Sequence, residues 1–274
     1  MEADPFEAER ASGWEVVHPL GGTPLDGVDV AGFRDRYAVG LDARVLPQPT
    51  VTVVIDLGDH PIALEDPGGT RTLSGLVAGM SPRPARVRGR HVDCVEVHLS
   101  PLTAYASLGV SPTDREDGVI DLADLWGRHE ALLREELAAA EGWEARFALL
   151  DRFLAERCGA GASVDPEVAA AWERIASLGG LVGVNTLAEA CGWSRKRLWS
   201  RFTSQVGLTP KRAAMLVRFD RAARALAAGL RAAEAAAVCG YADQSHLHRD
   251  VLAFAGCAPG ALGPARVRWS AREE

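Results

Sequence analysis

Two segments in the last third of the chain share one spacing of glycine, apolar residues and proline. In the first, Gly192 and an aromatic residue are followed, at offsets of 6, 10, 15 and 18 from the glycine, by Leu198, Phe202, Gly207 and Pro210. In the second, Gly240 and an aromatic residue are followed, at offsets of 7, 11, 16 and 19, by Leu247, Val251, Gly256 and Pro259. One extra residue after the aromatic accounts for every difference. We therefore interpret the two segments as copies of one structural unit.

Each copy has the sequence of a helix, a glycine turn and a second helix. Both glycines follow an Ala-rich stretch of helical pattern, Leu187–Cys191 in one copy and Ala232–Cys239 in the other. A helix commonly ends in a left-handed residue, which glycine adopts without a side-chain penalty. Ser194 and Asp243 then offer side-chain oxygens that suit the N-cap of the second helix. Because alanine lets two short helices approach closely, the pattern predicts two helix-turn-helix units.

The second helix of each copy is expected to have one buried and one exposed face. At about 100° per residue, Leu198 and Phe202 mark the buried side of the first helix, and Leu247 and Val251 mark that of the second. Side chains that suit base edges and phosphates gather away from these buried sides. On the first helix they are Lys196, Ser200 and Thr203, flanked by Arg197 and Trp199. On the second they are Gln244, Ser245, His246, His248 and Arg249.

The two segments resemble the DNA-binding domain of the AraC-type family of bacterial regulators, in which a central helix joins two helix-turn-helix units. The resemblance runs from Leu187 to Gly260, through LAEACGWSRKRLWSRFTSQVGLTPK and AAAVCGYADQSHLHRDVLAFAGCAPG, and GYADQSHLHR is close to the family signature. It implies base contacts from six side chains, namely Lys196, Trp199, Ser200, Gln244, Ser245 and Arg249.

The first copy departs from the family pattern at one position. Many members carry arginine two residues after the leucine of the recognition helix, whereas this chain has Ser200 there and Arg201 next. We assign the remaining polar side chains of both helices to phosphates or to the flanks of the groove. They are Arg197, Arg201, Thr203, His246 and His248.

Two longer helices are predicted next to these units. Asp165 caps one that has Pro166 in its first turn and runs to about Ser177. Thr209 caps the other, which runs from Pro210 to about Ala227 and would be about 27 Å long. A duplex turn is about 34 Å. This central helix is therefore expected to hold the recognition helices near successive major grooves on one side of DNA, with a modest bend.

Charge is divided unevenly along the chain. The whole sequence has a formal charge of −7, which taken alone argues against a nucleic-acid binder. Residues 1–164 carry 15 basic and 27 acidic side chains, whereas residues 165–274 carry 15 basic and 10 acidic ones. Because phosphates are neutralised locally, the excess of +5 in the second part is the relevant value.

The first part of the chain has a different pattern. Short β-rich runs punctuated by Pro and Gly, notably Thr50–Gly58 and His91–Leu99, predict strands. The pattern then turns helical over Pro101–Leu108, Leu122–Trp126, Arg128–Ala140 and Trp143–Arg157. The last two helices form a hairpin whose apolar stripes either mediate homodimerisation or cover the N-terminal core.

These observations predict an α+β protein with two domains. The small residues of Cys158–Val164 are expected to form a flexible boundary. A β-rich sensor or dimerisation domain ending in the hairpin is expected over residues 1–160, as many such regulators have. An all-α double helix-turn-helix domain is expected over residues 165–265.

The strongest rival interpretation is a metal-binding or ligand-binding sensor, or an enzyme, centred on the N-terminal domain. Cys94, Glu96 and His98 would share one face of a strand, and their side chains are zinc ligands. The chain contains no GxSxG, HExxH, phosphate-loop or paired-cysteine pattern. We therefore predict neither an enzyme nor a cofactor or metal site. A third class is a helical protein-interaction module without DNA binding.

The expected partners follow from the regulator interpretation. They are double-stranded DNA, RNA polymerase, a small-molecule effector sensed by the N-terminal domain, and a second copy of the chain. No run of eighteen apolar residues and no signal-peptide pattern occurs, so we expect a cytoplasmic protein that does not contact the membrane.

Overall fold

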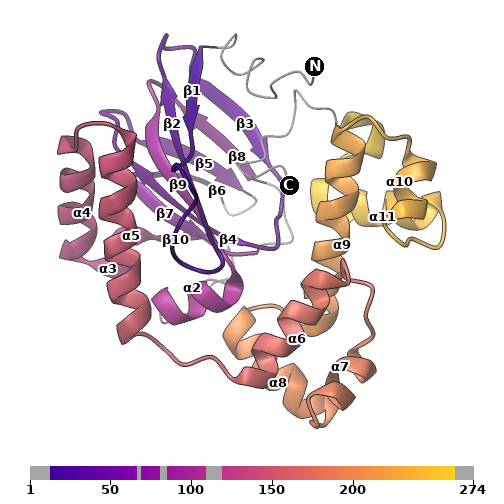
Figure 1. Cartoon of the computed structure of the whole chain (residues 1–274). Coiled ribbons are helices and arrows are strands. Elements are labelled where there is room, and N and C mark those ends of the chain that lie inside the picture. The colour runs from indigo at the N-terminus through magenta and orange to yellow at the C-terminus, as the bar shows by residue number, and fades with distance from the viewer. Residues whose placement is uncertain (1–12, 67–68, 81–84, 109–118, 263–274) are drawn as a thin grey trace.

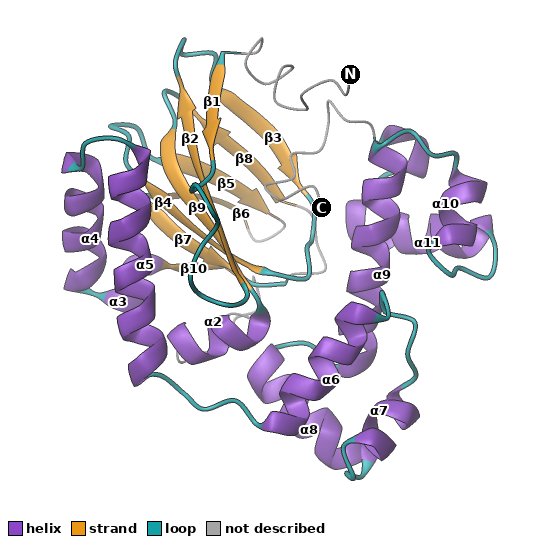
Figure 2. Ribbon diagram, viewed as in Figure 1, coloured by secondary structure: helices purple, strands orange, loops and turns teal. Residues whose placement is uncertain are grey.

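The computed structural model describes residues 13–66, 69–80, 85–108 and 119–262. Strands fill the first part of the chain and helices the second, which confirms the predicted α+β class (Figure 1, Figure 2). The strands are β1 (Trp14–Val17), β2 (Val28–Asp35), β3 (Leu41–Val45), β4 (Val51–Asp56), β5 (Ile62–Asp66), β6 (Gly69–Leu73), β7 (Gly75–Ala78), β8 (Ala85–Gly89), β9 (Asp93–Leu99) and β10 (Val119–Asp121).

The described helices lie in two groups along the chain. Those that follow the strands are α2 (Pro101–Leu108), α3 (Leu122–Trp126), α4 (Arg128–Ala139) and α5 (Trp143–Ala160). Those of the C-terminal part are α6 (Pro166–Ser177), α7 (Val184–Ala190), α8 (Arg195–Val206), α9 (Pro210–Ala227), α10 (Ala232–Val238), α11 (Gln244–Ala255) and the short 3-10 helix η2 (Pro259–Ala261). None of the described helices has both the length and the apolar content that a membrane span needs.

The strands form two antiparallel sheets packed face to face. One sheet has the order β1-β2-β9-β4-β7-β10 and the other the order β3-β8-β5-β6. The two predicted strands, now β4 and β9, are neighbours in the larger sheet, with Val53 opposite Val97. Apolar side chains from both sheets, such as Cys94 of β9 and Ile62 of β5, share one cluster between them.

The helical hairpin of α4 and α5 covers the other face of the larger sheet (Figure 1). Val95 and Val97 of β9 pack in one cluster with Leu133, Leu137 and Phe147 of the hairpin, and all five are buried. Burial of each such side chain contributes about 1.5–3 kcal/mol. The hairpin therefore covers the N-terminal core with these side chains. This is the second of the two alternatives predicted for its apolar stripes.

The segment between the two parts of the chain begins later than its composition predicts. Helix α5 continues to Ala160, so Cys158 lies within the helix rather than in a loop. A Cβ atom on Gly161 would lie 1.5 Å from the backbone oxygen of Ala106 in α2. The predicted start of the boundary at Cys158 is therefore wrong, because α5 continues to Ala160, and Gly161 lies close to α2.

The β part and the helical part also share a core. Leu46 and Met80 come from the strand region, are 2% and 1% exposed, and pack in the same apolar cluster as the C-terminal helices. Helix α2 contacts α8. Burial raises the pKa of Asp220 in α9. His98 of β9 is close enough to act on the same carboxyl in the opposite direction. The C-terminal helices are thus packed directly against the end of the β part.

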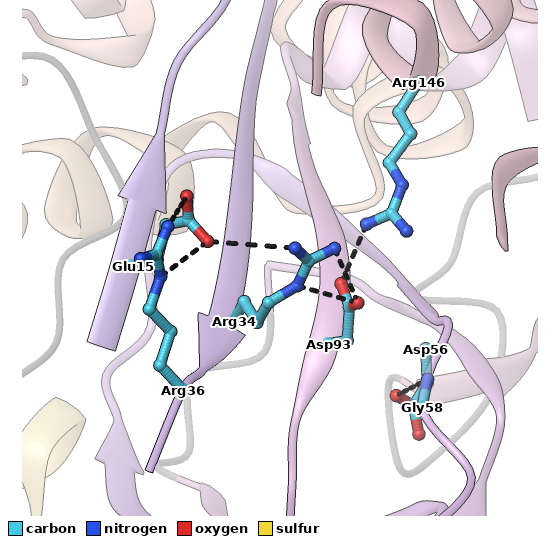
Figure 3. A network of polar contacts seen from close by, with 7 residues as sticks. All are labelled: Glu15, Arg34, Arg36, Asp56, Gly58, Asp93 and Arg146. Carbon is cyan, nitrogen blue, oxygen red and sulfur yellow. Dashed lines mark hydrogen bonds and ion pairs between the residues drawn. The ribbon is translucent and has the colours of Figure 1, made fainter. Parts of the chain in front are cut away.

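A network of charged side chains ties the start of α5 to the larger sheet (Figure 3). The Asp93 carboxylate accepts hydrogen bonds from Arg34 at 3.0 Å and from the buried Arg146 at 2.9 Å. The guanidinium carbons of these arginines lie 5.1 and 4.8 Å from the centroid of the Trp143 ring. The indole fits on the sheet because Gly32 has no side chain, since a Cβ atom there would lie 2.3 Å from it.

Asp56 lies near this network at the end of β4 and is only 2% exposed. Its Oδ1 atom accepts a hydrogen bond from the backbone N–H of Gly58 at 3.1 Å. Burial raises the pKa of Asp56 to about 6, and the negative charge of Asp93 acts in the same direction. The charged form of Asp56 therefore lowers the stability of the folded protein.

We predict that Asp56→Asn stabilises the protein in a pH-dependent way. The pKa of Asp56 is about 6 in the folded protein and 3.8 ordinarily, so the folded protein binds more protons than the unfolded chain between pH 3.8 and about 6. Stability of the unaltered protein therefore falls as pH rises from about 4 to about 6. The variant should gain about 1–3 kcal/mol at neutral pH and almost nothing near pH 4. Urea denaturation across this range measures the gain, and an equal gain at every pH would contradict the assignment.

Candidate nucleic-acid interface

Both predicted helix-turn-helix units are present, and their turns have the same geometry. Gly192 and Gly240 have φ angles of +64° and +71°, the left-handed conformation that the sequence predicted. In each turn the glycine and the next residue donate backbone hydrogen bonds to carbonyls at the end of the preceding helix, at 3.1 and 3.0 Å in one unit and 3.3 and 2.9 Å in the other. This is the Schellman pattern, which satisfies carbonyls that the helix end would otherwise leave free.

The recognition helices α8 and α11 begin at the predicted caps. Ser194 accepts a hydrogen bond from the backbone N–H of Arg197 at 3.2 Å, and Asp243 accepts one from that of His246 at 2.7 Å. The four residues predicted to form the buried sides, Leu198, Phe202, Leu247 and Val251, are all 0% exposed. The rotational setting of both helices about their axes therefore agrees with the prediction.

The two units lie at opposite ends of α9 (Figure 1). Helix α9 runs from Pro210 to Ala227, as the sequence predicted, and the Thr209 side chain caps it by accepting from the backbone N–H of Arg212. At 1.5 Å per residue its 18 residues span about 27 Å. One rigid element thus separates the two recognition helices.

The outer face of α8 presents most of the predicted side chains to solvent. Lys196, Trp199 and Ser200 are exposed, and Trp199 has 54% of its surface accessible. Arg197 is also exposed, and its guanidinium carbon lies 4.5 Å from the centroid of the Trp193 ring. Thr203 is only half-exposed. The helical-wheel estimate that placed Thr203 directly away from the core is therefore inaccurate.

Arg201 has a partner within the protein. Its guanidinium donates two hydrogen bonds to the Asp165 carboxylate, at 2.6 and 2.7 Å. This pairing holds the pKa of Asp165 below its usual value. Asp165 precedes α6 as predicted, but its carboxylate makes no capping bond there and binds α8 instead. Sequence reasoning missed this contact because 36 residues separate the two side chains.

The outer face of α11 is similarly open. Gln244, Ser245, His248 and Arg249 are exposed, whereas His246 is half-buried with its ring edge-on to Tyr241 at a centroid distance of 5.2 Å. Tyr241 itself is buried, with 6% of its surface accessible. The two helices therefore present similar polar faces, on which His246 is the least accessible of the residues predicted for the second unit.

Three of the arginines of α9 lie against other side chains or backbone of the protein. Arg218 forms an ion pair with Asp250 of α11, and Arg224 forms one with Asp220 one turn away, both at 3.0 Å. Arg221 is exposed, and its Nη1 atom would lie 1.8 Å from a Cβ atom on Gly179. The side chain of Arg218 is only 16% exposed, so it is poorly placed to reach a phosphate.

The rival site on β9 has the predicted alternation of side chains. Cys94 packs in the apolar cluster between the sheets. His98 lies 3.1 Å from Glu96 through Nε2, and its Nδ1 atom is within hydrogen-bonding distance of the hydroxyls of Thr50 and Thr52. Within the described parts of the chain, no three His, Cys, Asp or Glu side chains are grouped so that they could hold a metal ion.

The two turns differ in their surroundings, so alanine substitutions in them should destabilise the protein to different degrees. A Cβ atom on Gly192 would meet nothing within 4 Å, whereas one on Gly240 would lie 2.6 Å from Cδ2 of Leu181. Gly192→Ala should lower the free energy of unfolding by about 1–2 kcal/mol, because an alanine is strained in the left-handed conformation. Gly240→Ala should cost more, because Leu181 must also move. Thermal or urea denaturation measures both, and the difference should vanish in a Leu181→Ala background; equal costs in the native background would contradict the geometry.

Comparison with known proteins identifies the C-terminal region. Residues 187–263 match the model of a family described as a helix-turn-helix domain. An uncharacterized HTH-type transcriptional regulator of Bacillus subtilis (strain 168), YbfI, is 39% identical over 66 residues, which are 24% of this chain and 24% of that protein. The chain thus matches about a quarter of the length of this curated relative.

Solved structures that align with this chain include those of two bacterial proteins. ToxT from Vibrio cholerae aligns with a TM-score of 0.48 and 10% identity, over 86% of this chain and 97% of that one. The C-terminal domain of AraT, a response regulator from Geobacillus stearothermophilus, aligns with a TM-score of 0.36 and 19% identity, over 41% of this chain and 95% of that one. From the matched family model and the two units described above, the C-terminal part of this chain is a helix-turn-helix domain of the AraC type.

Proposed function

We propose that the protein is a sequence-specific DNA-binding transcription regulator that inserts α8 and α11 into successive major grooves. The observation that carries this proposal is the pair of equivalent, capped recognition helices at the two ends of one 18-residue helix. Each has a buried apolar side and an exposed polar side. A span of about 27 Å against a duplex turn of about 34 Å fits neighbouring grooves if the DNA bends modestly.

The side chains proposed to contact bases are six of those that α8 and α11 expose. Arginine and lysine pair with guanine, the glutamine amide pairs with adenine, and hydroxyls bond to either. The residues are Lys196, Trp199, Ser200, Gln244, Ser245 and Arg249.

Contacts with phosphates or with the flanks of the groove are proposed for the other predicted side chains of the two helices. Arg197 and His248 are exposed and suit this role. Arg201 reaches a phosphate only by leaving or sharing Asp165, and Thr203 and His246 are half-buried. In this proposal Arg197 and His248 therefore carry the flank contacts, and the other three residues contribute less.

The N-terminal part, residues 1–160, is proposed to sense a small-molecule effector or to pair subunits, and so to change how the domain of residues 165–265 occupies a promoter. The close packing of Gly161 on α2, and of Leu46 and Met80 in the helical core, supports direct transmission of such a signal. If subunits pair, we place the contact on the hairpin, where Leu132 of α4 is 52% exposed. A regulatory role also implies RNA polymerase as a partner and a cytoplasmic location.

We predict that DNA binding depends on one basic side chain from each recognition helix. Lys196→Ala and Arg249→Ala should each weaken binding to a selected duplex by about 1–3 kcal/mol. Binding should also weaken steeply as salt increases, because phosphate contacts release counterions. Mobility shift on fragments selected from genomic DNA measures both effects.

Arg86→Ala provides the matched control, since it removes one exposed arginine from β8 in the β part. The affinity of this variant for the selected duplex should stay close to that of the unaltered protein. Tight binding that neither Lys196→Ala nor Arg249→Ala changes would refute the assignment of the recognition helices.

A further inference from the structure

Arg218 joins the middle of α9 to the second recognition helix. Its Nη2 atom lies 3.0 Å from Oδ2 of Asp250, and the two side chains are only 16% and 9% exposed. The same guanidinium lies over the Tyr241 ring, with 4.5 Å between its carbon and the ring centroid. One arginine therefore contacts both the turn of the second unit and the helix that follows the turn.

This contact is largely buried between two helices that also pack through apolar side chains. Phe219 of α9 and Phe254 of α11 stack with their centroids 4.9 Å apart. Burial raises the pKa of Tyr241, and the negative charge of Asp250 adds to this effect. Ion pairs in such surroundings are weakly screened, and the loss of one partner leaves an uncompensated buried charge. The Arg218–Asp250 pair is therefore a strong restraint once the protein is folded.

The restraint acts on the rotation of α11 about its own axis. Apolar side chains such as Phe254 make contacts that depend little on direction, whereas a charge-assisted hydrogen bond has a preferred geometry. Asp250 follows Arg249 in the chain, and neighbouring helical residues differ by about 100° around the axis. A rotation that moved Asp250 away from Arg218 would turn Arg249 by the same angle, away from the base edges it is proposed to contact.

The first recognition helix is held at the equivalent position by a weaker pair. Arg201 precedes the buried Phe202 as Asp250 precedes the buried Val251, and its partner Asp165 lies on the segment before α6. The charges are reversed, and the side chains are 50% and 23% exposed. This pair is bidentate, but solvent screens an exposed pair more than a buried one. The two recognition helices are thus restrained to different degrees.

We propose that Arg218 is a positioning residue for sequence recognition: it binds no DNA itself and sets the orientation of α11 through Asp250. This inference rests on the proposed function. It assigns the base discrimination of the second unit to a contact within the protein, and it predicts that loss of this contact affects one half-site and leaves the other unchanged.

The experiment uses the full chain and a duplex selected from random sequence. Arg249→Ala and Lys196→Ala first identify the half-site that each helix contacts, because each relaxes discrimination at its own position. The ratio of dissociation constants for the selected and a substituted base pair is then measured in each half-site. Asp250→Asn should reduce this ratio by about tenfold in the α11 half-site and leave it unchanged in the α8 half-site.

Three further variants separate positioning from folding. The double variant Arg218→Met with Asp250→Leu removes both charges and keeps apolar volume, which buried ion pairs commonly tolerate. It should remain folded by thermal denaturation and lose the same discrimination. Asp250→Glu keeps the charge and should retain most of it. Asp42→Asn, which removes an exposed ion pair in the β part, should change neither half-site.

The outcomes distinguish a failure of the positioning role of Arg218 from a failure of the proposed DNA-binding function. If the unaltered protein binds no duplex DNA, the proposed function and this inference both fail. If it binds and the folded double variant discriminates as well as the unaltered protein in both half-sites, only the inference fails. An equal loss in both half-sites would likewise overturn it, because a general loss of structure has no preference for α11.

Discussion

Burial of α9 is the constraint on which the C-terminal part depends. Its buried side chains occur along the whole helix, from Pro210 and Ala213 at one end to Ala223 and Leu226 at the other. Because several of them are alanine, other helices can approach α9 closely. Phe219 is completely buried in the core that both helix-turn-helix units share. The spacing between the two units is therefore determined by a helix that cannot bend without disturbing both of them.

The features that sequence predicted best are those determined by neighbouring residues. The left-handed glycines, the caps Ser194 and Asp243, and the bounds of α9 all follow from local backbone chemistry, and the structure confirms them. The order of the strands could not be predicted in the same way. Pairing of β9 with β2 and β4 joins segments far apart in the chain, and alternation alone does not select a partner.

Side-chain partners were the least predictable part of the site. The sequence marks Arg201 and Arg218 as charged residues of predicted helices, but it does not show what lies opposite their side chains. Asp165 and Asp250 are 36 and 32 residues away from these arginines. Both arginines thus bind carboxylates that only tertiary packing brings close to them. For the same reason, composition alone misjudged the segment around Gly161.

The central claim is that α8 and α11 occupy neighbouring grooves on one side of the duplex. Hydroxyl-radical footprinting of the full chain on a selected duplex tests this claim most directly. The account predicts two protected regions centred about 10–10.5 base pairs apart on the same face of the DNA, of which Arg249→Ala weakens only one. A single protected region, or two regions on opposite faces of the helix, would contradict it.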